Sequence, residues 1–108
     1  MENYTQSWTQ FEIHSLAFSV LRKHLYPAFL IRGDFKLDGC RADIAVFKSN
    51  KGKPPTLKVI VEVKQQDDAS PTKAIQEYAK QNEVAYILIA GLKQAYKALD
   101  LVQEHLYK

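Results

Sequence analysis

The sequence predicts an α/β domain in which a mixed four-stranded sheet is flanked by helices. Stretches with helical spacing of apolar residues alternate with short strand-like runs, in the order α-β-β-β-α-β-α. Strands joined by turns pair antiparallel, whereas a right-handed crossover through a helix places the last strand parallel to its neighbour. With 108 residues, 46% of them hydrophobic, the chain suits one domain, residues 1–108, with a single small core.

The first half of the chain predicts a helix followed by a hairpin. Apolar residues recur at helical spacing from Thr9 to Leu25, and Tyr26-Pro27 ends the helix because the residue before proline avoids the helical region. The helix is expected to be largely buried along one broad arc. Phe11, Phe18, Leu21 and Leu25 form it, and it is widened by Ile13, Leu16, Ala17 and Val20. Alternating residues predict strands from Phe29 to Leu37 and from Arg41 to Phe47, and Asp38-Gly39 is a typical tight turn between them.

The next strand carries the most informative residues. A polar segment with two prolines, residues 49–55, predicts a turn, and Leu57 to Val63 returns as a strand. Side chains of a strand alternate between faces, so Glu62 and Lys64 lie on one face and the flanking valines on the other. Moving an acid and an ammonium out of water costs free energy, and groups kept in such a place usually serve a site.

A helix, a strand and a second helix complete the chain. Ser70 and Pro71 fit the N-cap and first-turn positions of a helix. The continuous apolar run from Val84 to Ala90 is typical of a strand buried on both faces. Residues 92–106 have apolar residues at helical spacing, Tyr96 among them, and predict a closing helix.

Three of these residues resemble the signature of the PD-(D/E)xK nuclease superfamily. That signature is an acid on one strand, a hairpin, and then acid-any-Lys on the next strand, and Asp43, Glu62 and Lys64 match it, with Ala42 in place of the family's proline. The pattern looks most like the nuclease module of type I restriction motor subunits, or small element-excision or resolvase-like nucleases. The resemblance implies a restriction-endonuclease-like core and a metal-dependent endonuclease that hydrolyses phosphodiester bonds in DNA.

The resemblance also implies a role for each residue. Asp43, Glu62 and the backbone carbonyl of Val63 would bind Mg²⁺ or Mn²⁺, and hard oxygen ligands suit these ions. Lys64 would orient the attacking water and stabilise charge in the transition state. The alternative reading is a same-face ion pair of Glu62 and Lys64 on an edge strand, of a kind that contributes only about 0–1 kcal/mol.

Further candidates have competing explanations. Glu12 matches a glutamate that many relatives carry on the first helix, but Thr9-x-x-Glu12 is equally a capping box. Tyr78 lies where related nucleases have the tyrosine of a Gln-x-x-x-Tyr motif. Ala74 stands in the glutamine position, and Gln76 or Gln65 would substitute for the glutamine. Packing on an amphipathic helix is the alternative for Tyr78.

Charge and composition are compatible with a nucleic-acid partner. The net charge is +3, and Arg41 and Lys73 lie near the proposed site in sequence, where they would contact phosphates unless they only form a solvated basic surface. Cys40 is the only cysteine and the three histidines lack ligand spacing, which argues against a disulfide or a zinc site.

No apolar run approaches the roughly 20 residues of a membrane span, and Met1 to Gln6 lack the features of a signal peptide. We therefore expect a cytoplasmic protein with DNA as its partner and no membrane association. A nuclease this small would take its specificity from a homodimer, a larger complex or DNA shape. Two other classes stay open: a binding module on the same fold that has lost catalysis, and a structural subunit of a complex.

Overall fold

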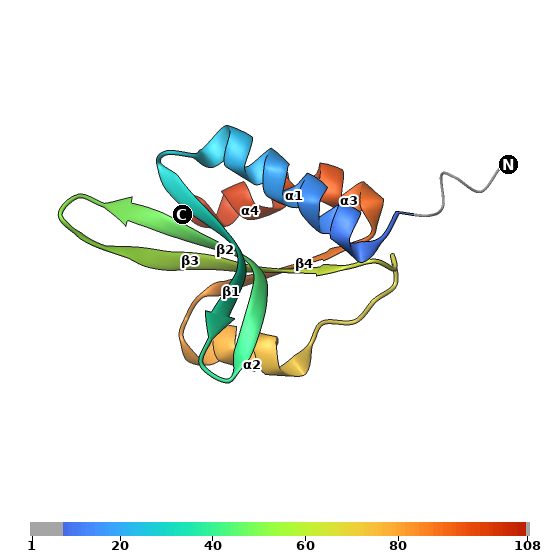
Figure 1. The fold of residues 1–108 in the computed structure, drawn as a ribbon. Helices are drawn as coiled ribbons and strands as arrows, with labels where there is room; N and C mark the ends of the chain where they lie inside the picture. The colour runs from blue at the N-terminus through green and yellow to red at the C-terminus, as the bar shows by residue number, and fades with distance from the viewer. Residues whose placement is uncertain (1–7, 108) are drawn as a thin grey trace, which may run out of the picture.

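A computed structural model describes residues 8–107 of the chain. The elements follow the predicted order, with one additional helix break near the C-terminus (Figure 1). They are α1 (Gln10–Leu25), β1 (Phe29–Leu37), β2 (Cys40–Asn50), β3 (Lys53–Lys64), α2 (Lys73–Gln81), β4 (Ala85–Ala90), α3 (Leu92–Tyr96) and α4 (Ala98–Leu106). None of the described helices has the length and apolar character needed to span a membrane. The expectation that residues 1–6 are no signal peptide lies outside the described residues.

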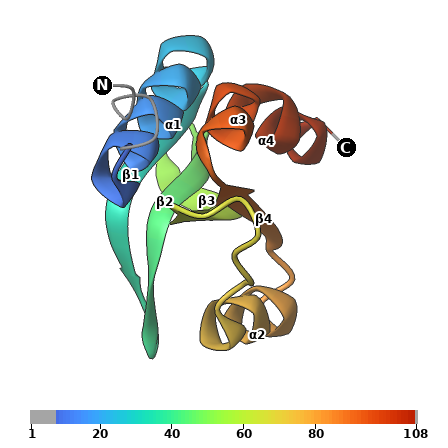
Figure 2. The same cartoon turned by 90° about the vertical axis from the view of Figure 1, so that its right-hand side faces the viewer.

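The strands form one sheet in the order β1-β2-β3-β4. β1 pairs antiparallel with β2 and β2 with β3, whereas β4 follows the crossover helix α2 and pairs parallel with β3. Helices α1, α3 and α4 lie on one side of the sheet and α2 lies on the other (Figure 2). The predicted class, α/β with a mixed four-stranded sheet flanked by helices, is confirmed.

Each face of the sheet has its own apolar cluster. Ile44 belongs to the cluster under α1, α3 and α4, and Ala42 belongs to the smaller cluster that includes Ile75 and Ala79 of α2. The pairing of β2 with β1 keeps one register across this stretch. Asp43 therefore lies where β2 passes from one cluster to the other.

The hairpin between β2 and β3 is tighter than the turn predicted for residues 49–55. β2 extends to Asn50 and β3 begins at Lys53, so Pro54 and Pro55 lie inside a strand. Proline lacks the N–H that regular pairing needs, but here the register with β2 shifts, and β4 pairs with β3 only further along. The prolines are thus accommodated in an irregular, one-sided part of β3.

Helix α2 begins later than predicted. Thr72 is its N-cap and Lys73 its first residue, in place of Ser70 and Pro71. The side chain of Thr72 makes no hydrogen bond to the helix, because its hydroxyl donates to the carboxylate of Glu62 on β3. The start of α2 is therefore set by a tertiary contact that a capping pattern does not contain.

Two expectations for the C-terminal third hold only in part. β4 contributes to the apolar clusters on both faces, Ile87 and Ile89 on one and Tyr86 on the other, but it is the edge strand, and only Ile89 and Ala90 of its residues are fully buried. The helix predicted for residues 92–106 is broken at Lys97, whose ψ of 9° leaves the helical range. The break lets α3 and α4 each pack on the sheet, and it leaves Tyr96 62% exposed.

Helix α1 buries the central part of the predicted arc, and Phe11 lies outside it. The buried residues are Ile13, Ala17, Leu21 and Leu25, which recur every four positions. Phe11 is 76% exposed. Two positions along a helix turn by about 200°, so Phe11 faces away from Ile13 and from the sheet.

Candidate active site

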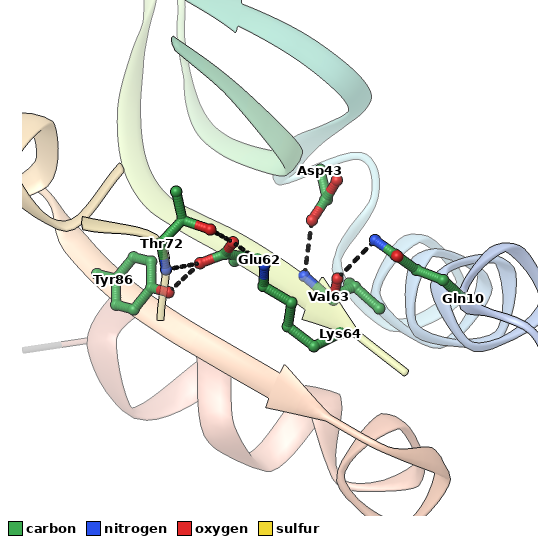
Figure 3. Close-up of polar contacts among 7 residues, drawn as sticks. All are labelled: Gln10, Asp43, Glu62, Val63, Lys64, Thr72 and Tyr86. Atoms are coloured by element: carbon green, nitrogen blue, oxygen red, sulfur yellow. Dashed lines mark hydrogen bonds and ion pairs between the residues drawn. The ribbon is translucent and has the colours of Figure 1, made fainter. Parts of the chain in front are cut away.

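Glu62 is the buried acid at the end of β3. It is 3% exposed, and Figure 3 shows its carboxylate directed toward Thr72 and Tyr86. The N–H of Thr72 donates to Oε1 at 2.9 Å, and the hydroxyls of Thr72 and Tyr86 donate to Oε2 and Oε1. The ammonium of Lys64 lies 3.2 Å from Oε2. Each carboxylate oxygen therefore has two partners, which is how a buried charge is stabilised.

The hydrogen bonds around Glu62 set the protonation states of Glu62 and Tyr86. Burial raises the pKa of Glu62, but the hydrogen bonds from Thr72 and Tyr86 and the contact with Lys64 outweigh it, so the pKa lies below its usual value. Burial and the adjacent carboxylate raise the pKa of Tyr86 well above its usual value. Glu62 is thus charged at neutral pH, and Tyr86 keeps the proton that it donates.

Replacing Tyr86 by phenylalanine removes one donor from Glu62 and is expected to lower the free energy of unfolding by about 1.5–3 kcal/mol, the usual contribution of a hydrogen bond to a charged group. Urea unfolding at neutral pH measures the change as a shift of the midpoint at constant slope. Tyr78→Phe is the matched control, since its ring packs against the same apolar cluster. Equal midpoints for wild type and Tyr86→Phe would show that the hydroxyl contributes nothing.

Asp43 is the second acid, and its hydrogen bonds and its pKa shift differ from those of Glu62. It is partly buried, and the N–H of Val63 donates to its Oδ2 at 2.8 Å. Within residues 8–107, no group donates a hydrogen bond to the second carboxylate oxygen, Oδ1. Burial raises the pKa of Asp43, and the nearby charge of Glu62 adds to this, while Val63, His14 and Lys64 offset the rise only in part. The protein alone therefore stabilises the charged form of Asp43 poorly.

Helix α1 fixes the ends of β2 and β3 through two polar side chains. The amide Nε2 of Gln10 donates to the carbonyl of Val63 at 2.9 Å, and His14 Nε2–H donates to the carbonyl of Asp43 at 2.8 Å. Figure 3 shows Asp43 and Gln10 meeting at Val63, away from the carboxylate of Glu62. The backbone at Val63 is thus held from both sides.

The other candidates from the sequence lie in different settings. The carboxylate of Glu12 accepts hydrogen bonds from the backbone N–H and hydroxyl of Thr9, which completes the capping box. The residues of α1 that bond to the ends of the strands are therefore Gln10 and His14, not Glu12. The side-chain amide of Gln65 donates to the carbonyl of Trp8 at 2.8 Å.

The candidates for phosphate contact are spread over two elements. Arg41 on β2 is exposed and forms an ion pair with Asp34 at 3.0 Å. Lys73 is exposed in the first turn of α2, and Tyr78 packs against the smaller apolar cluster. None of these contacts brings Arg41, Lys73 or Tyr78 into the hydrogen-bond network around Glu62.

The donor atoms suit a hard divalent cation at Asp43. Among the described residues, no three His, Cys, Asp or Glu side chains are grouped so that they could hold a metal ion by themselves. Mg²⁺ does not need such a group, since it commonly binds through one or two carboxylates, several waters and substrate phosphate. Asp43 Oδ1 and the carbonyl of Val63 are oxygens of this kind, and a cation would stabilise the charge of Asp43. Glu62 would join them only if Lys64 left its Oε2.

A comparison with solved structures finds a likeness over most of the chain. A VRR_NUC domain matches 92% of this chain and 99% of its own length, with a TM-score of 0.59 and 19% sequence identity. The chain shares the fold of that domain. The predicted restriction-endonuclease-like core is thereby confirmed. No protein-family model matches the chain, and no curated protein matches it.

Four residues of the site were not found from the sequence: Gln10, His14, Thr72 and Tyr86. Tyr86 carries the only side-chain polar atom in the run from Ala85 to Ala90, and it pairs with Ile60, two positions before Glu62. A search for a partner of the buried acid on the neighbouring strand would have pointed to it. Gln10, His14 and Thr72 offer no such signal, because their roles depend on how α1 and the loop before α2 pack.

Proposed function

We propose that this protein is a metal-dependent endonuclease of the PD-(D/E)xK type that hydrolyses phosphodiester bonds in DNA. The observation that carries the proposal is that two acids and a lysine gather at the end of β3: Asp43 accepts the N–H of Val63 at 2.8 Å, and Lys64 pairs with Glu62 at 3.2 Å. A fold shared with a domain whose name designates a nuclease supports the same reading.

In the proposed reaction, different residues would bind the metal ion and orient the attacking water. Asp43 and the carbonyl of Val63, with Glu62, would hold Mg²⁺ or Mn²⁺, which when bound acidifies a water and neutralises charge on phosphoryl oxygens. The ammonium of Lys64 lies 3.2 Å from Glu62, and it would donate hydrogen bonds that orient the attacking water and stabilise the developing charge. The water oxygen bonds to phosphorus as the water gives up a proton to solvent. The bond from phosphorus to the leaving sugar oxygen breaks, and that oxygen takes up a proton from solvent.

The remaining candidates take supporting roles in this proposal. Arg41, Lys73, Gln65 and Tyr78 would contact the DNA backbone, and the exposed ammonium of Lys73 is accessible for that. Glu12 stays a candidate site residue only if the capping box opens, since its carboxylate is bonded to Thr9. We place the enzyme in the cytoplasm, with a homodimer or a larger complex as the source of specificity.

Cleavage of a DNA panel tests the proposal. Linear, supercoiled, single-stranded and four-way-junction DNA are incubated with wild type or Lys64→Met, in Mg²⁺, Mn²⁺ or EDTA. We expect metal-dependent cutting that falls at least about 10²-fold in Lys64→Met, because a charge-stabilising donor is lost. Lys58→Met, six residues earlier on β3, is the control. A folded wild type that cuts none of these substrates with either metal would refute the proposal for the isolated chain.

A second candidate is a binding module on the same fold that has lost turnover. The observation in its favour is that both oxygens of Glu62 already have protein donors, including Lys64. This reading predicts DNA binding in wild type and Lys64→Met with no cutting by either. The panel above separates the two candidates if gel-shift binding is measured alongside cleavage.

A further inference from the structure

Phe11 is a large apolar side chain left in solvent beside the proposed site. Its 76% exposure is the largest among the exposed large apolar residues between positions 8 and 107. Its neighbour in sequence, Gln10, bonds to the carbonyl of Val63 at 2.9 Å. Phe11 is therefore carried on the turn of α1 that contacts the ends of the catalytic strands, and the packing of the core does not explain it.

Two cavities meet at Phe11. One has a volume of about 400 Å³ and is lined by Gln10, Phe11, His14, Asp34 and Asp43. The other, of about 300 Å³, is lined by Phe11, His14, Ser15, Phe18, Ser19 and Gly33. Because Phe11 and His14 line both, we treat them as one groove between α1 and β1, the Phe11 groove. One end of the groove is the carboxylate proposed to bind the metal ion.

The lining of the Phe11 groove is aromatic with polar edges. The rings of His14 and Phe18 are nearly parallel, with an interplanar angle of 9° and centroids 6.4 Å apart. Gly33 forms the opposite wall, and a Cβ there would lie 3.6 Å from Phe18 and 3.7 Å from His14, so a side chain would narrow the groove. Such a groove suits a flat ring that also has hydrogen-bonding atoms at its edge.

We propose that an unpaired nucleobase of the substrate stacks on Phe11 in this groove, next to the phosphate that is cut at Asp43. This inference rests on the nuclease function proposed above and names its substrate class. Aromatic side chains bind bases of any sequence, since every base has a π face. A base within a duplex has both faces covered by its neighbours, so only an unpaired or flipped base can stack on Phe11. The preferred substrate is then DNA with a single-stranded segment at the point of cleavage.

Charge around the groove fits a base better than it fits a phosphate. Asp34 and Asp43 line it and would repel a phosphate, whereas a neutral base carries no charge to be repelled. Arg41 lines neither cavity but pairs with the lining residue Asp34 at 3.0 Å, so it would offer a cation to the next phosphate along the DNA strand. The base and the backbone would thus bind separate, complementary parts of this surface.

Binding of single-stranded and paired DNA tests the inference. Fluorescence anisotropy in EDTA, where no cutting occurs, measures the dissociation constants of a labelled single strand and of the same strand in a blunt duplex. Phe11→Ala is expected to weaken single-strand binding about 5- to 150-fold, the range for loss of one stacked base, and to leave duplex binding unchanged. Phe11→Trp, which keeps an aromatic face, is expected to bind the single strand as well as wild type. Tyr96→Ala is the control, as Tyr96 is also exposed and lines neither cavity.

Each outcome decides the inference. Equal single-strand affinities for wild type and Phe11→Ala would overturn it, and metal-dependent cutting by wild type would then leave the nuclease function standing. If Phe11→Ala changes the sedimentation of the protein and weakens both DNAs equally, the groove is a contact between subunits and the inference is wrong. Selective loss of single-strand binding that Phe11→Trp restores would support stacking, whether or not the isolated chain cuts DNA.

Discussion

Replacing Asp43 by asparagine is expected to reduce metal-dependent DNA cleavage at least about 10²-fold, since a neutral amide binds Mg²⁺ poorly and the developing charge loses its counter-ion. The amide has nearly the shape of the carboxylate, and its oxygen can still accept the N–H of Val63, which lies 2.8 Å from Oδ2 in the wild type. The variant therefore removes the charge and keeps the backbone contact. Cleavage rates on the substrate panel measure the loss.

The same change is expected to leave the fold at least as stable as the wild type at pH 7. Burial raises the pKa of Asp43 above its usual 3.8, so the folded state binds this proton more tightly than the unfolded state does. Stability from this group is then lost as pH rises through the raised pKa, and the charged form is unfavourable at pH 7. Asparagine carries no such charge.

Urea unfolding at pH 7 measures the stability of Asp43→Asn. Asp68→Asn, which changes an exposed acid in the loop before α2, is the control for the cleavage rates and for the unfolding. Cleavage by Asp43→Asn at the wild-type rate would exclude Asp43 as a metal ligand. A midpoint well below that of the wild type would show instead that the charge of Asp43 supports the fold, and any loss of cleavage would then have a structural cause.

The charged residues of the candidate site can be recognised in the sequence, but the contacts that hold them in place cannot. Glu62 and Lys64 stand out because charged residues at the end of an apolar strand are unusual, and alternation places them on one face. Asp43 is indicated by the resemblance to the nuclease signature. That Glu62 faces Thr72 and Tyr86 could not be found in this way. Those contacts join β3 to the loop before α2 and to β4, and local spacing contains no information about such distant pairs.

The errors in the fold have the same origin. Local patterns predicted Phe11 in the buried arc of the first helix, but the packing of Ile13 on the sheet turns Phe11 outward. Pro54 and Pro55 are strong turn signals, and a one-sided, irregular part of β3 accommodates them within the strand. Where a residue's neighbours come from elsewhere in the chain, tertiary contacts decide its structure.

Replacing Glu62 by glutamine is expected to have the opposite effect on stability from the change at Asp43, with a loss of about 2–3 kcal/mol in the free energy of unfolding at pH 7. The amide removes the charge and turns an NH₂ group toward atoms that are themselves donors. The hydroxyl of Thr72 and the ammonium of Lys64 both contact Oε2. If the NH₂ group takes the place of this oxygen, both groups lose their acceptor. If it takes the place of Oε1, the donors at that oxygen lose theirs.

The dependence on pH identifies charge as the cause. The folded-state pKa of Glu62 lies below its usual 4.5, so its stabilisation is fully present above that value and is lost as pH falls through the lowered pKa. The difference between wild type and Glu62→Gln should therefore shrink in acid, and urea unfolding at pH 7 and at about pH 3 measures it. Glu77→Gln, on the exposed face of α2, is the control.

A loss of stability in Glu62→Gln that is equal at both pH values would point to packing rather than charge. If the loss of stability disappears at low pH, the same change from carboxylate to amide has different effects at Glu62 and at Asp43. Donors within the protein outweigh burial at Glu62, whereas at Asp43 the one N–H of Val63 and the nearby cations do not. Asp43 is then the acid at which a bound cation gains most, and Glu62 holds Lys64 beside it at 3.2 Å until metal or substrate competes for the same oxygen.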